Sequence, residues 1–382
     1  MDVKIQMVDL KSQHAKIKSE LGNAIQDVIE SSIFVKGKEV AYFENELSNY
    51  LGVKYIIGCG NGTDAIQIAL LALGLKYGDE VIVPAFTYPS AIEVIILLGL
   101  SPIMVDIDIQ SYNIDVRKIE SKITSRTKAI IPVHLFGQSS EMEAIVQIAI
   151  KYNLFIIEDN AQSLGTVYTF SNGDKKRTGT IGNIGTTSFF PSKNLGCMGD
   201  GGAIMTNDDE LAQKIRMIAN HGQKELYVHE MIGVNSRLDS LQAAILRVKL
   251  KHLDSYEAKR NEAAKHYDSY FENNEYVKIP FRNRYSTHVF HQYTISLSKK
   301  VDRNKLRNYL LDRGIQTMIY YPIVACNQLA YSSKNNNILD FPMSELATQS
   351  VLSLPIHTEM NETLLKEICK TLTEGLGAQG LS

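Results

Sequence analysis

The feature that most constrains the fold is an alternation of two patterns between residues 52 and 220. Short runs rich in β-branched and other apolar residues are separated by longer runs in which apolar residues recur at helical spacing. Apolar strands that alternate with helices form parallel sheets that are covered on both faces. We therefore expect an α/β unit with a mostly parallel sheet.

The alternating segments can be assigned one by one. Strands are expected at 53–59, 79–85, 101–107, 128–137, 154–159, 185–190 and 201–206. Helices are expected at 64–75, 89–100, 141–152 and 209–222.

The pattern changes in the last third of the chain. Residues 238–272 form one long helical pattern, charged along one side, that suits a bridge between domains. A smaller α+β unit follows, with strands expected at 288–297 and 315–323 and helices at 303–314 and 361–376. Because 382 residues also favour two domains, we expect a large domain over 1–245, including an N-terminal helical segment, and a small domain over 246–382.

Composition narrows the classes of partner. Lys and Arg number 40 against 42 Asp and Glu, so no bulk charge favours nucleic acid or an anionic membrane. No apolar run approaches the roughly 20 residues that span a bilayer, and the first residues lack the pattern of a signal peptide. The cysteines, at 59, 197, 326 and 369, form no metal-binding or disulfide pattern. We expect a cytoplasmic protein that binds no metal, nucleic acid or membrane.

A glycine-rich turn at 58–62 leads from the first expected strand into the first helix. Backbone N–H groups at such a helix start, together with the helix dipole, form a site for an anion such as phosphate. Thr63 and Asp64 also suit an ordinary N-cap, so this turn alone leaves both interpretations open.

Two further side chains are expected at the same edge of the sheet. The strand at 154–159 ends in Asp159, and ligands of open α/β sheets gather at the carboxyl ends of strands, although an acid there can simply cap the next helix. One strand later, Lys193 is the only lysine in the glycine-rich segment 188–203. A loop lysine is usually a solvated surface charge.

A phosphate cradle, a carboxylate and an amine together are what pyridoxal 5′-phosphate requires. N–H groups hold its phosphate, a carboxylate keeps its pyridine nitrogen protonated, and a lysine forms a Schiff base with its aldehyde. Ser188 is a further candidate phosphate ligand, and glycines after Lys193 would allow backbone to pass close to the ring. The three segments therefore predict a pyridoxal phosphate site.

The order of the motifs carries a family resemblance over nearly the whole chain. The segments "GNGTDAI", "GDEVIVPAFTY", "IIEDNAQSLG", "SFFPSKNLGCMGDGGA" and "GVNSRLDSLQAAIL" resemble the DegT/StrS family of nucleotide-sugar aminotransferases. This resemblance implies the aspartate-aminotransferase (type I) fold, in which a large domain with a mostly parallel seven-stranded sheet between helices is joined to a smaller α+β C-terminal domain.

The resemblance also implies roles for individual residues. Lys193 would carry the Schiff base and shuttle the proton, and Asp159 would pair with the pyridine nitrogen. The other implied cofactor contacts are Gly62, Thr63 and Ser188 at the phosphate, Tyr88 and Gln162 at the ring, and Asn235 at the phosphate of the partner subunit in a homodimer. The implied substrate contacts are Arg237, Tyr320 and Tyr321.

Departures from the family pattern bear mainly on the substrate. Asn160 stands where the family often has alanine, and Tyr320 and Cys326 stand in "YYPIVACNQ" where the family often has histidines, at positions expected to face the sugar. Three histidines stay open: His134 as a core or a catalytic residue, and His221 and His291 as substrate contacts.

The implied reaction moves an amino group from L-glutamate to a keto group of a nucleotide-activated sugar. Segment 188–203 most resembles members that act on a UDP-linked 2-acetamido-3-keto-glucuronate, whose carboxylate Arg237 would face, for surface polysaccharide or lipopolysaccharide. A 4-keto UDP-sugar and a dTDP-linked 3-keto sugar are the close alternatives. A sugar dehydratase, which typically lacks the lysine, and a non-catalytic regulator are more remote, because Lys193 and the other cofactor residues argue against both.

Overall fold

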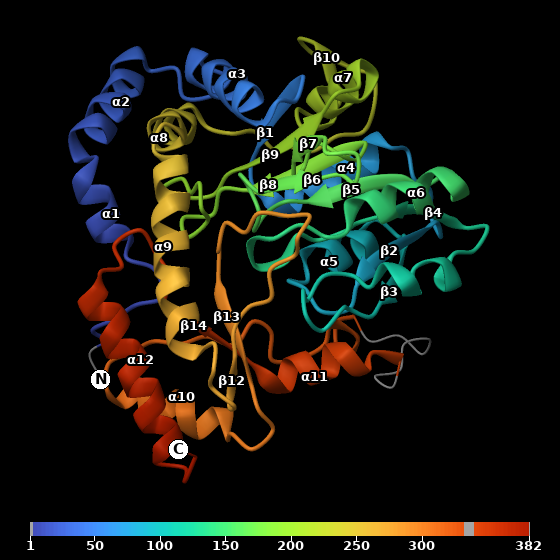
Figure 1. Ribbon diagram of the computed structural model, residues 1–382. Coiled ribbons are helices and arrows are strands. Elements are labelled where there is room, and N and C mark those ends of the chain that lie inside the picture. The colour runs from blue at the N-terminus through green and yellow to red at the C-terminus, as the bar shows by residue number, and fades with distance from the viewer. Residues whose placement is uncertain (1–2, 332–339, 382) are drawn as a thin grey trace.

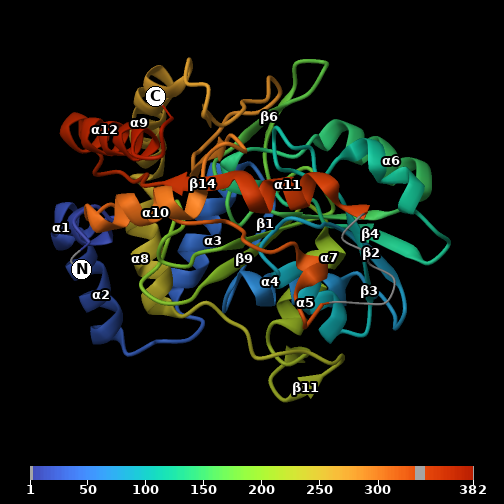
Figure 2. The ribbon, with the colours of Figure 1, turned by 90° about the horizontal axis from the view of Figure 1, so that it is seen from below.

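The computed structural model describes residues 3–331 and 340–381. Figures 1 and 2 show a larger α/β unit, and a smaller unit formed by the C-terminal part of the chain. The ends of the two expected domains, residues 1–2 and 382, and the segment 332–339 lie outside the described residues.

The large unit is built on one seven-stranded sheet. In spatial order its strands are β1 (Tyr55–Cys59), β9 (Gly202–Thr206), β8 (Ile184–Ser188), β5 (Phe155–Asp159), β4 (Thr127–Ile130), β2 (Glu80–Pro84) and β3 (Ser101–Val105). All neighbouring pairs are parallel except those of β9, which is antiparallel to both β1 and β8. The predicted mostly parallel sheet is confirmed, and each expected strand of the large unit is present.

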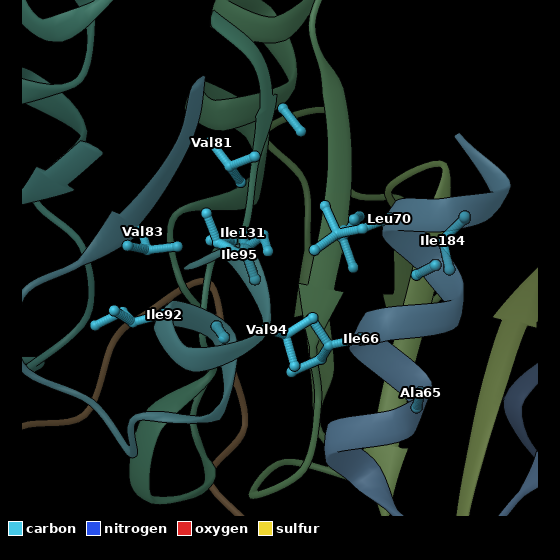
Figure 3. Packing of buried hydrophobic residues seen from close by; sticks show 14 of the residues in the cluster. Ala65, Ile66, Leu70, Val81, Val83, Ile92, Val94, Ile95, Ile131 and Ile184 are labelled. Atoms are coloured by element: carbon cyan, nitrogen blue, oxygen red, sulfur yellow. The ribbon is translucent and has the colours of Figure 1, made fainter. Parts of the chain in front are cut away.

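Apolar side chains on both faces explain why these strands read as continuous apolar runs. On β2, Val81 and Val83 pack with α4 (Gly62–Ala72) and α5 (Ser90–Leu97), whereas Ile82 points into the cluster under α6 (Met142–Tyr152). Figure 3 shows the first of these clusters, where side chains of the two helices meet those of the sheet. Because it is buried on both faces, the sheet is a rigid support for the residues at its edges.

The expected bridging helix is two helices. α8 (Ser240–Leu250) packs against α2 (Lys18–Ser31) and α3 (Lys38–Leu51) of the large unit. α9 (Leu253–Phe271) supplies part of the small unit's core. The proposed domain boundary at 245/246 falls inside α8.

The small unit is an antiparallel sheet covered by helices. β13 (Tyr293–Leu297) lies between β12 (Val277–Lys278) and β14 (Val351–Leu354), with α10 (Arg303–Asp312) and α12 (Glu362–Gly377) in the same core. The strand expected at 315–323 does not form. Its residues make only isolated bridges, from Ile315 to Ile5 and from Met318 to Ser353 of β14.

α1 (Leu10–Lys16) lies in the expected N-terminal helical segment, together with α2 and α3. Short elements without a clear sequence signal are α11 (Pro342–Ser350) and the hairpins β6 (Val167–Thr169)–β7 (Lys175–Arg177) and β10 (Gln223–Glu225)–β11 (Val228–His229). Within the described ranges no helix is long and apolar enough to cross a membrane. The same residues contain no cluster of side chains suited to hold a metal ion.

Candidate active site

A cavity of about 540 Å³ opens at one edge of the central sheet. Its walls come from segments that follow β1, β2, β4, β5 and β8, which all end at this edge. It is lined by every cofactor contact implied for a single chain, namely Gly62, Thr63, Tyr88, Asp159, Gln162, Ser188 and Lys193. Both substrate tyrosines, Tyr320 and Tyr321, line it as well.

The N-terminus of α4 points two free donors toward the cavity. Asn61 is the N-cap, and its side-chain oxygen accepts from Asp64 N at 2.8 Å. The N–H groups of Gly62 and Thr63 form no hydrogen bond within the described chain. The expectation that Thr63 or Asp64 caps this helix is wrong, because the helix begins two residues earlier and leaves both in its first turn. Free N–H groups at a helix start suit an anion.

The close approach of two segments fixes the shape of this cradle. A Cβ atom at Gly62 would lie 2.7 Å from Cβ of Ser188, which is too short for any real contact. Glycine therefore lets β8 end beside the start of α4, where the Ser188 hydroxyl joins the free N–H groups.

Asp159 brings a carboxylate to the floor of the cavity. It is the last residue of β5, is 6% exposed, and accepts a hydrogen bond from Ala161 N at 3.0 Å. Burial raises the pKa of Asp159, while the Ala161 N–H and the charge of Lys193 oppose the rise. A bound cationic group would stabilise this carboxylate in its charged form.

Lys193 brings an amine to the same cavity. The loop between β8 and β9 turns sharply here, and Lys193 N donates to Phe190 O at 2.8 Å. In the part of the chain that the structure describes, its Nζ forms no hydrogen bond or ion pair. Burial lowers the pKa of Lys193 to about 8, against the pull of Asp159. A lower pKa leaves more neutral amine, the form that attacks a carbonyl group.

Two glycines that follow Lys193 allow close packing of the protein's own backbone. A Cβ atom at Gly196 would lie 2.4 Å from Pro191 O, and one at Gly202 would lie 2.5 Å from the backbone of Asn61. These two glycines are required because protein backbone passes close to protein backbone. The loop is thereby folded tightly on itself and against the start of α4.

Aromatic side chains form the wall opposite the sheet. Gln162 accepts from Phe136 N at 2.8 Å and donates to the Tyr321 hydroxyl at 3.0 Å. The rings of Tyr321 and Tyr88 are 6.2 Å apart, and the Tyr88 side chain is 57% exposed. Gln162 is therefore held between the Phe136 backbone and Tyr321, while Tyr88 lines the cavity with more than half of its surface exposed.

The structure accounts for two departures from the family pattern. Asn160 is buried and bonds both the hydroxyl and the carbonyl oxygen of Thr178, at 2.7 and 3.0 Å, so it serves the fold. Cys326 was expected to face the sugar, but it packs in the core beneath α4 and α5. A hydrogen bond of 3.2 Å from Ala325 N to Ala85 O holds the short turn that contains Cys326 against the large unit.

The three open histidines have different surroundings. His134 is fully buried; Nδ1 accepts from Ser140 N at 3.1 Å, so Nε2 donates to Glu158 at 2.9 Å, and the ring is a core residue. His291 lines the cavity, and burial lowers its pKa well below the usual value, which keeps the ring neutral. His221 lies outside the cavity, and its carbonyl oxygen bonds His229.

Two implied site residues do not reach this cavity. Arg237 lines a separate cavity of about 250 Å³ together with Lys36, and its NH1 donates to Asn220 at 3.1 Å. Asn235 is exposed. Between them, buried Ser236 donates to the Asp64 carboxylate at 2.7 Å and ties this loop to the start of α4.

Some lining residues were missed by sequence reasoning. They are Asn61, Thr87, Phe190, Asp200 and Gln292, among others. Asn61 had a usable signal, because asparagine just before a helix is a preferred N-cap. Gln292 had no signal of its own, although the neighbouring His291, which also lines the cavity, had been a candidate.

Comparison with known proteins identifies the family. Residues 15–373 match the model of the DegT/DnrJ/EryC1/StrS aminotransferase family. The chain is 44% identical to the UDP-2-acetamido-2-deoxy-3-oxo-D-glucuronate aminotransferase of Pseudomonas aeruginosa, covering 97% of this chain and 99% of that protein. It is 42% identical to the dTDP-3-amino-3,6-dideoxy-alpha-D-galactopyranose transaminase of Aneurinibacillus thermoaerophilus, covering 96% and 98%.

A solved structure agrees in fold. DesV of S. venezuelae in complex with a ketimine intermediate superposes with a TM-score of 0.92 at 36% identity, covering 97% of this chain and 98% of that one. The cavity also suits the family's cofactor, because it combines free N–H groups, a buried carboxylate and an unpaired amine. The chain therefore belongs to the DegT/DnrJ/EryC1/StrS aminotransferase family, and its cofactor is pyridoxal 5′-phosphate.

Proposed function

We propose that the protein transfers an amino group from L-glutamate to the keto group of a nucleotide-activated sugar, with a UDP-linked 2-acetamido-3-keto-glucuronate as the leading substrate. The observation that carries this proposal is the unpaired amine of Lys193 in one cavity with the Asp159 carboxylate and the free N–H groups of α4. The 44% identity to the Pseudomonas aeruginosa protein supports the choice of sugar.

Each group in the cavity has a task in this proposal. When bound, the cofactor supplies an electron sink and an aldehyde that can carry the amino group. Gly62 N, Thr63 N and the Ser188 hydroxyl, which line the cavity, would hold its phosphate, and Asp159 would hold the proton on its ring nitrogen. Lys193 Nζ would bond its aldehyde carbon between turnovers and would carry a proton to and from the reacting carbon.

The substrate would enter past the aromatic wall. Tyr320 and Tyr321 line the same cavity as Lys193 and are proposed to contact the sugar ring. Arg237, outside its own chain's cavity, is proposed to reach the sugar carboxylate in the other subunit of a homodimer. The 42% identity to a dTDP-sugar transaminase keeps a dTDP-linked 3-keto sugar as the second candidate.

A homodimer with shared sites is part of the proposal. Asn235 is exposed and does not line the cavity of its own chain, which suits a residue that completes the phosphate site of a partner subunit. We further propose that the product serves surface polysaccharide or lipopolysaccharide synthesis in the cytoplasm.

A panel of keto sugars with labelled glutamate tests the function. Purified protein is incubated with UDP- and dTDP-linked 3-keto and 4-keto sugars, and transfer of ¹⁵N from glutamate is measured by mass spectrometry. We expect transfer to the UDP-linked 3-keto-glucuronate above all others. Preference for a dTDP sugar would select the second candidate. Absence of transfer to every sugar, in protein that absorbs near about 420 nm as a Schiff base does, would contradict the proposed function.

A further inference from the structure

A second buried lysine lies beneath the loop that carries Lys193. Lys249 of α8 is 1% exposed, and its Nζ donates to the carbonyl oxygen of Gly196 at 2.5 Å. The same amine lies 3.3 Å from Nε2 of His14 on α1. Among the described residues no carboxylate pairs with it, so these two contacts must offset the cost of burying an ammonium group.

His14 is suited to accept from this amine. Burial and the charge of Lys249 both lower the pKa of His14, so its ring is neutral and Nε2 can act as an acceptor. The neighbouring Gln13 donates to the Thr358 hydroxyl at 3.2 Å. Lys249 thus lies where the Lys193 loop meets α1, and α1 in turn contacts the small unit.

Gly196 packs directly against the segment that precedes Lys193. Because a Cβ atom at Gly196 would lie 2.4 Å from Pro191 O, the backbone at 191 and at 196 must be packed together. Lys193 lies between these two positions, and its N–H closes the turn onto Phe190 O. Fixing the Gly196 carbonyl therefore restrains the whole turn from which Lys193 projects.

The other bonds of this loop do not replace that contact. Cys197 N donates to Phe189 O at 2.8 Å and closes the base of the loop. Asn194 Nδ2 donates to Val289 O at 3.1 Å and holds one side. In the described chain, Lys249 is the only donor to the Gly196 carbonyl.

We propose that Lys249 is a positioning residue: by holding the Gly196 carbonyl, it keeps the Lys193 amine directed at the cavity, ready to bond the cofactor. This rests on the proposed function, because it takes Lys193 as the lysine that forms the Schiff base. Without the ammonium, a buried carbonyl is left without a donor, which favours loop conformations that turn it toward water by about tenfold or more.

The test compares Lys249→Met with two matched variants. Val248→Ala, on the same helix but packed against Ile17 and Leu21, controls for a general loss of stability. Lys249→Arg restores a charged donor. The first measurement is hydrogen exchange of the Lys193 amide in cofactor-free protein, and the second is the rate at which added pyridoxal 5′-phosphate forms the Schiff base.

We expect both quantities to change in Lys249→Met alone. Exchange of the Lys193 amide should be about tenfold faster and Schiff-base formation about tenfold slower, whereas Val248→Ala should match the wild type. Lys249→Arg should recover much of the difference. If Lys249→Met does not fold, Lys249→Gln, which is too short to reach Gly196, takes its place with the same expectation.

Wild-type exchange and wild-type Schiff-base kinetics in a folded Lys249→Met protein would overturn the proposal. Equal changes in Val248→Ala would overturn it too, because they would report general destabilisation. The proposed function fails separately: it fails if wild-type protein forms no Schiff base at Lys193, whatever the exchange data show.

Discussion

Two adjacent residues at the end of β5 have opposite environments. Glu158 is fully buried and its carboxylate accepts four hydrogen bonds, from Gly179 N, Ile181 N, Gly182 N and His134 Nε2, at 2.6 to 2.9 Å. Asp159 points to the other face and accepts one, from Ala161 N. The saturated carboxylate holds the fold together, and the unsaturated one, next to the unpaired Lys193 amine, is left for a ligand.

The same contrast separates the two buried lysines. The Lys249 amine is held by a carbonyl group and an imidazole, whereas the Lys193 amine has no partner in the described chain. Burial lowers the pKa of each to about 8. Similar pKa values therefore do not identify the reactive amine; its free donor capacity and its place in the cavity do.

The largest effect is expected when the Lys193 amine itself is removed. Lys193→Ala removes the group that bonds the cofactor and shuttles the proton, so turnover should fall about 10³-fold or more. The melting temperature should stay close to that of the wild type, because the amine makes no bond that holds the fold. Steady-state transfer assays and thermal unfolding measure the two quantities. Near-normal turnover would show that Lys193 has been assigned the wrong role.

Substitution of Asp159 should mainly lower the rate, whereas substitution of Glu158 should mainly lower stability. Asp159→Asn removes a charge-assisted hydrogen bond to the ring nitrogen, so we expect about a hundredfold loss of rate in a folded, yellow protein. Glu158→Gln should instead lower the free energy of unfolding by about 3 kcal/mol, because an amide cannot accept all four bonds. Denaturant unfolding and transfer assays of both variants measure the two effects. A loss of stability in Asp159→Asn and a loss of rate alone in Glu158→Gln would contradict these assignments.

Subunit mixing tests whether the Asn235 loop belongs to the partner's site. Lys193→Ala and Asn235→Ala subunits, each strongly impaired alone, should together recover roughly a quarter of wild-type activity, since one site of each heterodimer is intact. Subunit exchange is verified by mass spectrometry. Exchange without recovery would place Asn235 in the site of its own chain.

The smallest expected effect is a shift in pH dependence. Only the neutral amine attacks an aldehyde, and burial lowers the pKa of Lys193 to about 8 from an ordinary value of about 10.4. Schiff-base formation by cofactor-free protein should therefore rise with pH and level off above about pH 8. Asp159→Asn removes a charge that favours the protonated amine, so the midpoint should move to lower pH. A wild-type midpoint of Schiff-base formation at about pH 10, close to the ordinary lysine pKa, would contradict the burial of this amine.

Much of the large unit was predictable because its signal is local. Continuous apolar strands such as β2 and β5 must be buried on both faces, and this alone implies helices on either side. The edge where Asp159 and Lys193 meet follows from the parallel topology.

The wrong predictions concern contacts between segments that are far apart in sequence. The segment 315–323 has strand-like composition, but it makes only isolated bridges, to Ile5 and to Ser353 of β14. Lys249 and Arg260 read as part of a charged helix face, yet both are buried, 1% and 2% exposed. Sequence spacing cannot tell which long charged side chains will find acceptors inside the fold.

Borohydride reduction followed by peptide mapping tests the central claim most directly. Protein loaded with pyridoxal 5′-phosphate is reduced, digested and sequenced by mass spectrometry, with Lys193→Ala treated in parallel. We expect one major modified peptide in the wild type, with the reduced cofactor on Lys193, and none in the variant. Modification of Lys249 or of a surface lysine in place of Lys193 would contradict it.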